Sequence, residues 1–332
     1  MSTSRSIDLL EHRRSAADDP FVVAAAQLGG PWLDVNARLD RAIQAGELAA
    51  AHGAKVIAFP ECYLSGYPYW LSRTNGATFG DRLQKKAYRY YLQSGIEVGG
   101  PEVRRLVQLA ADLDLTVIMG LTERAQGTTY CSLLTISRHG IVGHHRKLVP
   151  TYDERLVWGY GDGYGLRSHL VGTARIGSLN CWENWMPQAR QAMYATGEDV
   201  HFGVWPGSVK LTGDITRFTA MEGRVFSVAA GGLLRRDDVP ADFPLAEQLL
   251  ADLEEMPFDG GTAIAGPDGH WVVEPISGRE GVVIAELDLG RVAEERFTFD
   301  PTGHYSRPDI LSTTVDRNRR HAVEMVEQEA FL

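Results

Sequence analysis

The sequence predicts a layered α/β fold, in which sheets are covered by helices on one side and packed against each other on the other. Two observations support this fold class. From Phe21 onward, short runs rich in apolar and β-branched residues alternate with stretches whose apolar residues recur at helical spacing. The connections between these runs are of two kinds, tight hairpin turns and helical crossovers, as expected for mixed sheets.

The first elements place a carboxylate at the end of a strand. An apolar run at Phe21–Ala26 predicts a strand, and an amphipathic helix follows it, with Asp34 as its N-cap and Gly53 as its stop. The apolar face of this helix comprises Leu39, Ala42, Ile43, Ala49 and Ala50. A second predicted strand, Lys55–Pro60, leads directly into Glu61.

The next elements lead to a lysine in the same way. Val103–Ala110 carries a helical pattern, and the apolar run Thr116–Leu121 predicts a strand. Tyr130–Ser137 and Ile141–His145 form the arms of a predicted hairpin. The second arm ends just before Lys147, so we expect this lysine at a strand end as well.

A cysteine occupies a third strand end. Arg175–Asn180 predicts a strand that ends at Cys181, and a helix is expected from Pro187 to Gly197, with proline and glycine in their preferred end positions. Three reactive residue types therefore follow three predicted strands.

Further strands complete a single predicted domain. They are expected at Val200–Trp205, Val225–Leu234, Thr262–Ala265, His270–Val273 and Val282–Leu289. Because no long linker interrupts the series, we predict one domain over residues 21–310, with polar tails at residues 1–20 and 311–332.

Composition narrows the function. The chain has 332 residues with a net charge of −10, which argues against general binding to nucleic acid or anionic membranes and favours a small-molecule partner. No apolar run reaches the roughly 18 residues of a membrane span, and the N-terminus lacks a signal-peptide pattern, so we expect a cytoplasmic protein. Cys62, Cys131 and Cys181 fit neither a disulfide framework nor a zinc site.

Cys181 is the candidate nucleophile. It lies at a predicted strand-to-helix turn, where a thiol is exposed and backbone N–H groups converge on it. A nearby cation or helix N-terminus would favour the reactive thiolate. The alternative is an inert cysteine buried in the core, which spacing alone does not exclude.

Glu61 and Lys147 are the candidate partners of this thiol. Apolar and aromatic neighbours surround Glu61 in the sequence, and burial would raise its pKa toward that of a base near neutral pH, unless a cation such as Lys147 lowers it again. Each residue also has a simpler interpretation: Glu61 as a surface glutamate, and Lys147 as part of a solvated basic run.

Three motifs surround the candidate residues: Phe59-Pro60-Glu61, Arg146-Lys147-Leu148-Val149-Pro150-Thr151 and Asn180-Cys181-Trp182-Glu183-Asn184-Trp185-Met186-Pro187. In this order they resemble the motifs of the nitrilase superfamily, and within it those of the nitrilase branch. Gly159–Gly163 and Phe299–Asp309 extend the similarity, so it covers about Phe21 to Asp309. The resemblance implies a four-layer α-β-β-α sandwich that pairs into homodimers and assembles further into spirals.

The same resemblance implies a Glu61, Lys147 and Cys181 triad, with Glu154 orienting substrate and catalytic groups. It implies hydrolysis of a nitrile to a carboxylic acid and ammonia through a thioimidate and a thioester on Cys181, with Glu61 as general base and Lys147 stabilising the intermediate. The Trp182-Glu183 pair is typical of nitrilases rather than of amidases or carbamoylases. The first alternative to a nitrilase is an amidase or N-carbamoyl hydrolase with the same triad, and the second alternative is a catalytically silent scaffold.

Other site predictions are more limited. Tyr67, Trp182 and Trp205 are candidate substrate-binding residues, although aromatic clusters also form cores and subunit interfaces. We predict no metal site, because His144 and His145 would point to opposite faces of a strand. The glycines of Gly159–Gly165 lack a phosphate-binding pattern and predict a loop. No cofactor is expected.

Overall fold

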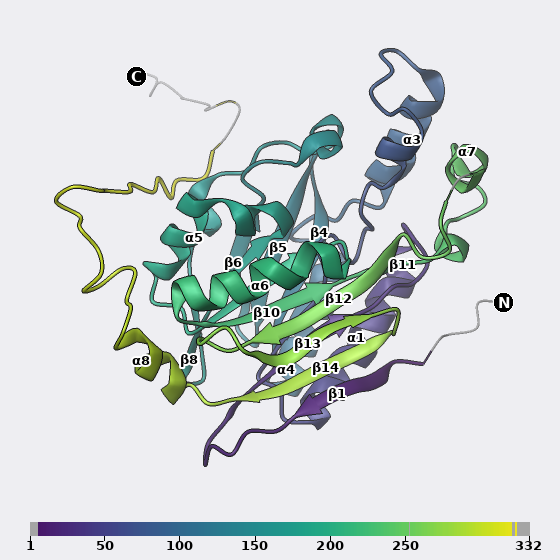
Figure 1. The fold of residues 1–332 in the computed structure, drawn as a ribbon. Helices are drawn as coiled ribbons and strands as arrows, with labels where there is room; N and C mark the ends of the chain where they lie inside the picture. The colour runs from purple at the N-terminus through teal and green to yellow at the C-terminus, as the bar shows by residue number, and fades with distance from the viewer. Residues whose placement is uncertain (1–5, 252, 321–322, 324–332) are drawn as a thin grey trace, which may run out of the picture.

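A computed structural model describes residues 6–251, 253–320 and 323. Figure 1 shows two sheets packed face to face, with helices on their outer sides. The first sheet has the order β1-β14-β2-β3-β4-β5-β6, and the second has the order β11-β12-β10-β9-β8-β7, with β13 paired to β12. The predicted α/β class and four-layer arrangement are confirmed.

The element bounds agree closely with the sequence patterns. In the first sheet the strands are β1 (Asp8–Arg13), β2 (Phe21–Gln27), β3 (Val56–Ala58), β4 (Thr116–Ala125), β5 (Thr128–Ser137), β6 (Gly140–Arg146) and β14 (Gly281–Leu287). In the second sheet they are β7 (His169–Val171), β8 (Ala174–Asn180), β9 (Val200–Trp205), β10 (Phe226–Gly231), β11 (Leu233–Leu234), β12 (Phe258–Ala265) and β13 (Trp271–Ser277).

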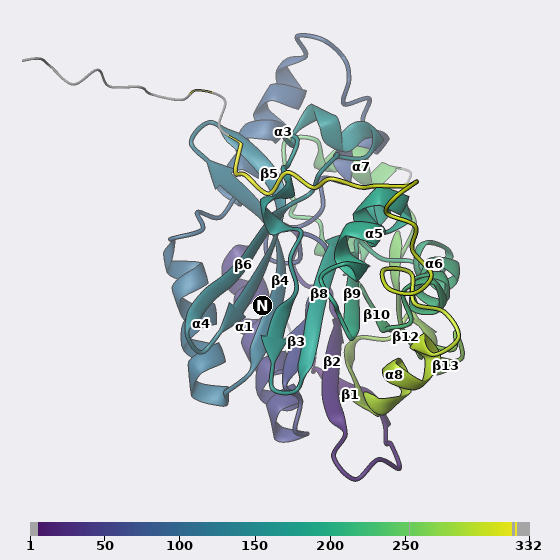
Figure 2. The ribbon, with the colours of Figure 1, turned by 90° about the vertical axis from the view of Figure 1, so that its left-hand side faces the viewer.

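Helices cover both outer faces. The helices of the structure are α1 (Val35–Ala51), α2 (Trp70–Arg73), α3 (Arg82–Gln93), α4 (Pro101–Leu113), α5 (Pro187–Tyr194), α6 (Val209–Gly223), α7 (Ala246–Ala251) and α8 (Gly290–Arg296). In Figure 2, α1 and α4 lie outside the first sheet, and α5 and α6 lie outside the second. As the sequence predicted, the Asp34 side chain caps α1 by accepting from the Ala37 N–H.

Apolar layers hold the sandwich together, and two of them lie against the first sheet. One lies between α1, α4 and the first sheet, and includes Leu39, Leu106 and Ile57. The other lies between the two sheets, where Val23 and Ile118 of the first sheet share a core with Phe202 of the second. Burial of these strands on both faces explains their nearly continuous apolar runs.

The structure differs from the prediction at the N-terminal end, while residues 1–5, 321–322 and 324–332 of the predicted tails lie outside the described residues. Asp8–Arg13 is an edge strand of the first sheet, parallel to β14, and not part of a polar tail. Leu10 is the only buried residue of this strand, and most of the other side chains are polar. The strand is held by backbone hydrogen bonds at the sheet edge, and such bonds leave no apolar pattern in the sequence. At the other end, Arg319 forms an ion pair with Asp162 at 3.1 Å and donates to the His144 carbonyl.

Candidate active site

Glu61 follows β3 and is held close to the neighbouring strand β4. The Phe59 N–H donates to the Ile118 carbonyl, which continues the β3–β4 pairing up to this residue. A Cβ at Gly120 of β4 would lie 2.1 Å from the Pro60 carbonyl oxygen and 3.0 Å from the Glu61 Cα. Only glycine permits this approach, so Gly120 fixes the position of the Glu61 backbone.

Lys147 follows β6 and is positioned by a similar contact. Its N–H donates to the Cys131 carbonyl at 2.8 Å. A Cβ at Gly161 would lie 2.5 Å from the Lys147 carbonyl oxygen, so the glycine-rich loop packs directly on the lysine backbone. Glu154 lies in the short 3₁₀ helix Tyr152–Leu156, where Thr151 is the N-cap.

Cys181 lies at the strand-to-helix turn that the sequence predicted. It directly follows β8 and is the first residue of the 3₁₀ helix Cys181–Trp185. Its φ of 46° is in the left-handed region, which is strained for a residue with a Cβ. Asn180 and Glu183 form a capping box across this turn.

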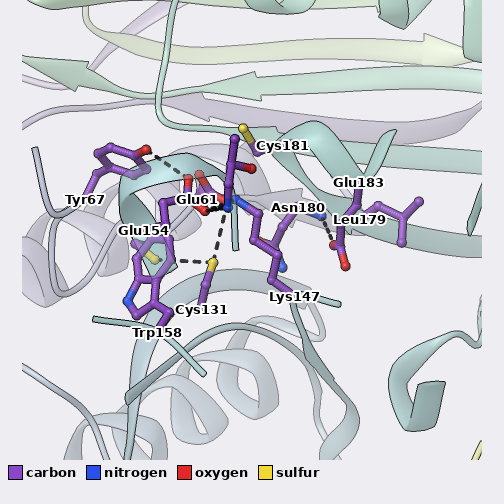
Figure 3. Close-up of polar contacts among 12 residues, drawn as sticks. Glu61, Tyr67, Cys131, Lys147, Glu154, Trp158, Leu179, Asn180, Cys181 and Glu183 are labelled. Atoms are coloured by element: carbon purple, nitrogen blue, oxygen red, sulfur yellow. Dashed lines mark hydrogen bonds and ion pairs between the residues drawn. The ribbon is translucent and has the colours of Figure 1, made fainter. Parts of the chain in front are cut away.

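The structure brings the predicted catalytic residues together. The Lys147 Nζ lies 2.9 Å from the Glu61 Oε1 and 2.7 Å from the Glu154 Oε2. Figure 3 shows these side chains converging near Cys181, whose thiol interacts electrostatically with all three charged groups. Cys181 and Glu61 are each 3% exposed, and Lys147 and Glu154 are each 1% exposed. The charged groups therefore lie in a region nearly free of solvent, where electrostatic interactions between them are strong.

The surroundings set the charge of the lysine and the glutamate. Burial alone would lower the pKa of Lys147, but Glu61, Cys181 and Glu154 together raise it well above its ordinary value. Burial raises the pKa of Glu61 to about 7, although Lys147 opposes the shift. Lys147 is thus an ammonium, and Glu61 is a base poised near neutral pH. The Glu61 Oε2 has no hydrogen-bond partner among the described residues, so it is available to accept a proton.

The protonation of the nucleophile differs from our expectation. The sequence led us to expect that Lys147 would favour a thiolate. Burial instead raises the pKa of Cys181 well above its ordinary value, and Glu61 raises it further, while Lys147 and a backbone hydrogen bond from Trp182 act in the opposite direction. Cys181 therefore rests as a thiol, and a base would have to remove its proton before the sulfur could act as a nucleophile.

Glu183 has a role that the sequence did not reveal. Its carboxylate accepts hydrogen bonds from the Leu148 N–H and the Asn180 N–H, and it lies 3.0 Å from the His145 Nε2. It therefore joins the segment that carries Lys147 to the turn that carries Cys181. Glu183 is part of the motif Asn180–Pro187, but the order of residues in the sequence does not identify its partners.

Cys131 is a second residue that the sequence analysis did not place in the site. Its Sγ lies 3.5 Å from the Glu61 Oε1 and 3.5 Å from the Cys62 Sγ. Cys131 comes from β5, one of the arms of the predicted hairpin, and no motif marked it. It contacts the same oxygen of Glu61 that Lys147 binds.

The three candidate substrate-binding residues lie in different surroundings. The Tyr67 hydroxyl donates to the Glu154 Oε1 at 2.9 Å. Trp205 is 1% exposed and packs in one apolar cluster with Cys181. The Trp182 indole is 47% exposed and lies beside Trp185, so its contact with the sulfur is through its backbone.

Hollows near and far from the site differ in size. A cavity of about 20 Å³ is lined by Glu61, Tyr67 and Phe258, among others, and has room for one water molecule. A hollow of about 1050 Å³, lined by residues that include Asp34 and Asp237, contains none of the triad residues.

No group of three or more metal-binding side chains occurs within residues 6–251, 253–320 and 323. His144 lies against Glu123, whereas His145 lies against Glu183, as expected for neighbours that point to opposite faces of a strand. No helix in the described part of the chain is long and apolar enough to span a membrane.

Comparisons with known proteins show the family of the chain. A carbon-nitrogen hydrolase family model matches residues 22–297. The chain is 37% identical to a bifunctional nitrilase/nitrile hydratase of Nicotiana tabacum over 89% of this chain and 85% of that protein. It is 37% identical to a nitrilase of Bradyrhizobium diazoefficiens, covering 84% and 87% of the two chains. It is 34% identical to an aliphatic nitrilase of Rhodococcus rhodochrous, covering 92% and 81%.

Solved structures support the fold. A CN-hydrolase superfamily protein of Xanthomonas campestris aligns with a TM-score of 0.65 at 18% identity, over 84% of this chain and 95% of that one. A nitrilase-superfamily amidase from Nesterenkonia aligns with a TM-score of 0.61 at 17% identity, over 85% and 96%.

The fold and the comparisons define a hydrolase, and its candidate site places a cysteine beside a buried carboxylate and an ammonium. The chain belongs to the carbon-nitrogen hydrolase family, and it is a hydrolase that acts on carbon-nitrogen bonds.

Proposed function

We propose that the protein is a nitrilase that converts an organic nitrile to the carboxylic acid and ammonia, with Cys181 as nucleophile. The observation that carries the chemistry is the Lys147 ammonium, held between Glu61 and Glu154 and close enough to interact with Cys181. The choice of a nitrile is supported by the Trp182-Glu183 pair and by relatives named as nitrilases.

The first half of the reaction forms a thioimidate. Glu61 takes the proton from the Cys181 thiol as the sulfur attacks the nitrile carbon, forming the S–C bond and placing negative charge on the nitrogen. Glu61 then returns the proton to that nitrogen. Lys147 and the Trp182 N–H face this charge, and preorganised donors of this kind are each worth about a hundredfold or more in rate.

The second half releases ammonia and then the acid. Glu61 accepts a proton from a water that attacks the thioimidate carbon and passes it to the nitrogen. The hydroxyl proton of the tetrahedral intermediate then also moves to the nitrogen through Glu61, so that ammonia leaves and a thioester remains. A second water, activated in the same way, releases the carboxylic acid and restores the thiol. If the intermediate expels the thiol instead, an amide forms. Some relatives are named nitrilase/nitrile hydratase, which is consistent with such a branch.

A panel of aliphatic, aromatic and arylacetonitrile substrates tests the proposal. We expect ammonia and acid from at least one nitrile, a mass adduct on Cys181, and little turnover of the matching amides. Rapid amide turnover with inert nitriles would identify an amidase or N-carbamoyl hydrolase. A Cys181→Ala variant indistinguishable from the parent would favour a silent scaffold.

A homodimer or larger assembly and a cytoplasmic location stay predictions from the sequence. Sedimentation velocity of the purified protein tests the first, and cell fractionation tests the second.

A further inference from the structure

A buried chain of three side chains ends on the backbone of the nucleophile. The Glu198 Oε1 lies 3.0 Å from the His201 Nδ1, and the His201 Nε2 lies 2.8 Å from the Asn184 Oδ1. The Asn184 Nδ2 donates to the Cys181 carbonyl at 2.9 Å and to the Leu179 carbonyl at 3.3 Å. Glu198 and His201 are fully buried, and Asn184 is 2% exposed.

The direction of each hydrogen bond in this chain follows from its neighbours. Asn184 faces two carbonyl oxygens on one side, so its NH₂ group lies there and its oxygen faces His201. The His201 Nε2 is therefore a donor. The His201 Nδ1 faces both oxygens of the Glu198 carboxyl group, at 3.0 and 3.2 Å.

The surrounding backbone leaves space for these groups. Gly177 of β8 pairs with His201 of β9, and a Cβ at Gly177 would lie 1.9 Å from the Glu198 Oε2. A Cβ at Gly203 would lie 3.2 Å from the Asn184 Oδ1. Larger residues at these positions would displace members of the chain, so it is built into the packing of the second sheet.

Cys181 needs such support because its backbone is strained. A non-glycine residue with positive φ persists only where its surroundings hold it, and Asn184 binds the carbonyls of Cys181 and of Leu179 before the turn. Asn184 itself is held from the other side by His201. It acts on the backbone, because its amide contacts the carbonyl of Cys181 and not the sulfur.

We propose that Glu198, His201 and Asn184 form a positioning relay, which fixes the Cys181 turn and thereby aims the sulfur and the Trp182 N–H at the substrate. This proposal rests on Cys181 being the nucleophile of the proposed function. None of the three residues touches the reacting atoms, so all three are positioning residues.

Asn184→Asp tests the relay, because it keeps the shape of the side chain and removes the N–H that binds the Cys181 carbonyl. We expect kcat to fall about tenfold or more while KM changes little. The rate constant for alkylation of Cys181 by iodoacetamide should fall in parallel. Alkylation does not depend on the identity of the substrate, so it separates failure of the relay from failure of the nitrilase proposal.

Gln27→Glu is the matched control. Gln27 is also a fully buried amide that donates to one backbone group and accepts from another, but it lies in β2 and binds Arg279 and Thr262. We expect its stability to change and its alkylation rate to stay at the parent value.

A second pair of variants covers the case in which Asn184→Asp does not fold. Glu198→Gln keeps an acceptor for the His201 Nδ1, whereas Glu198→Ala does not, so Gln should preserve more of kcat than Ala. Folded relay variants with parent alkylation rates would overturn the proposal. Losses of kcat and of alkylation rate no larger than those of Gln27→Glu would also overturn it. The same holds if every relay variant fails to fold, because the three side chains would then serve the fold alone.

Discussion

The two sheets hold their catalytic groups by different means. On the first sheet, Glu61 and Lys147 are held by ion pairs between side chains, with Glu154 completing the cluster, in addition to the close backbone contacts at Gly120 and Gly161. On the second sheet, Cys181 is held through its backbone, which has a positive φ and accepts a hydrogen bond from Asn184 at its carbonyl. Charged groups can hold one another in place, whereas a nucleophile that must reach its substrate needs a free side chain on a rigid backbone.

Cys181→Ala should give the largest functional effect with the smallest structural one. Removal of the sulfur abolishes the covalent route, and we expect hydrolysis to fall by at least about a thousandfold. The sulfur takes part in one backbone contact of the turn, the hydrogen bond from the Trp182 N–H, whereas the capping box and the Asn184 contact do not involve it. Circular dichroism and the melting temperature should therefore stay close to those of the parent. Substantial remaining turnover would mean that another group is the nucleophile.

Lys147→Met should damage both activity and stability. It leaves two buried carboxylates without their shared cation, which costs about 3–5 kcal/mol when a buried charge loses its partner. Urea denaturation measures this loss. Adding Glu154→Gln to Lys147→Met removes one of the unpaired charges, and should recover part of the stability but not the activity. A variant as stable as the parent would contradict the ion-pair account of the first sheet.

Patterns along the chain predicted most of the fold, because alternating apolar runs located the central strands. They placed Glu61, Lys147 and Cys181 at strand ends, and the resemblance to a family suggested that the three act as a triad; the structure places these residues close together. The edge strand Asp8–Arg13 escaped prediction because an edge buries few side chains and is held by backbone pairing.

Contacts between residues far apart in the sequence could not be predicted, for a different reason. Cys131 and Glu61 are 70 residues apart, and His145 and Glu183 are 38 apart. Only the folded sheets bring them into contact. The protonation of Cys181 depends on burial and on the balance of three nearby charges, which no local pattern contains.

The pH dependence of kcat/KM should report Glu61. Its pKa is raised to about 7, chiefly by burial, and it must be a carboxylate to take the thiol proton. Activity should therefore be retained above pH 7, and should fall as the pH drops and Glu61 becomes protonated, by about tenfold per pH unit well below the midpoint. Glu61→Gln should remove this decrease at low pH, the acid limb of the profile, together with most of the activity. A midpoint near 4.5 would show that burial does not govern the base.

Cys131→Ala should produce the smallest effect, confined to the charged side of the site. The Cys131 thiol donates to the Glu61 Oε1 and lowers the pKa of Glu61, as the weakest of the contributions to it. Its removal should shift the acid limb upward by a few tenths of a pH unit, as expected for a weak hydrogen bond worth about 0.5 kcal/mol, and leave the plateau above pH 8 unchanged.

Cys62→Ala is the matched control for this shift, because Cys62 contacts the Cys131 sulfur and has no hydrogen bond to Glu61 among the described residues. Its acid limb should coincide with that of the parent. If Cys131→Ala instead lowered the plateau and left the limb in place, the thiol would act on the position of Glu61 and not on its charge. The charged side would then depend on packing as well as on ion pairs, and the contrast between the two sheets would be weaker.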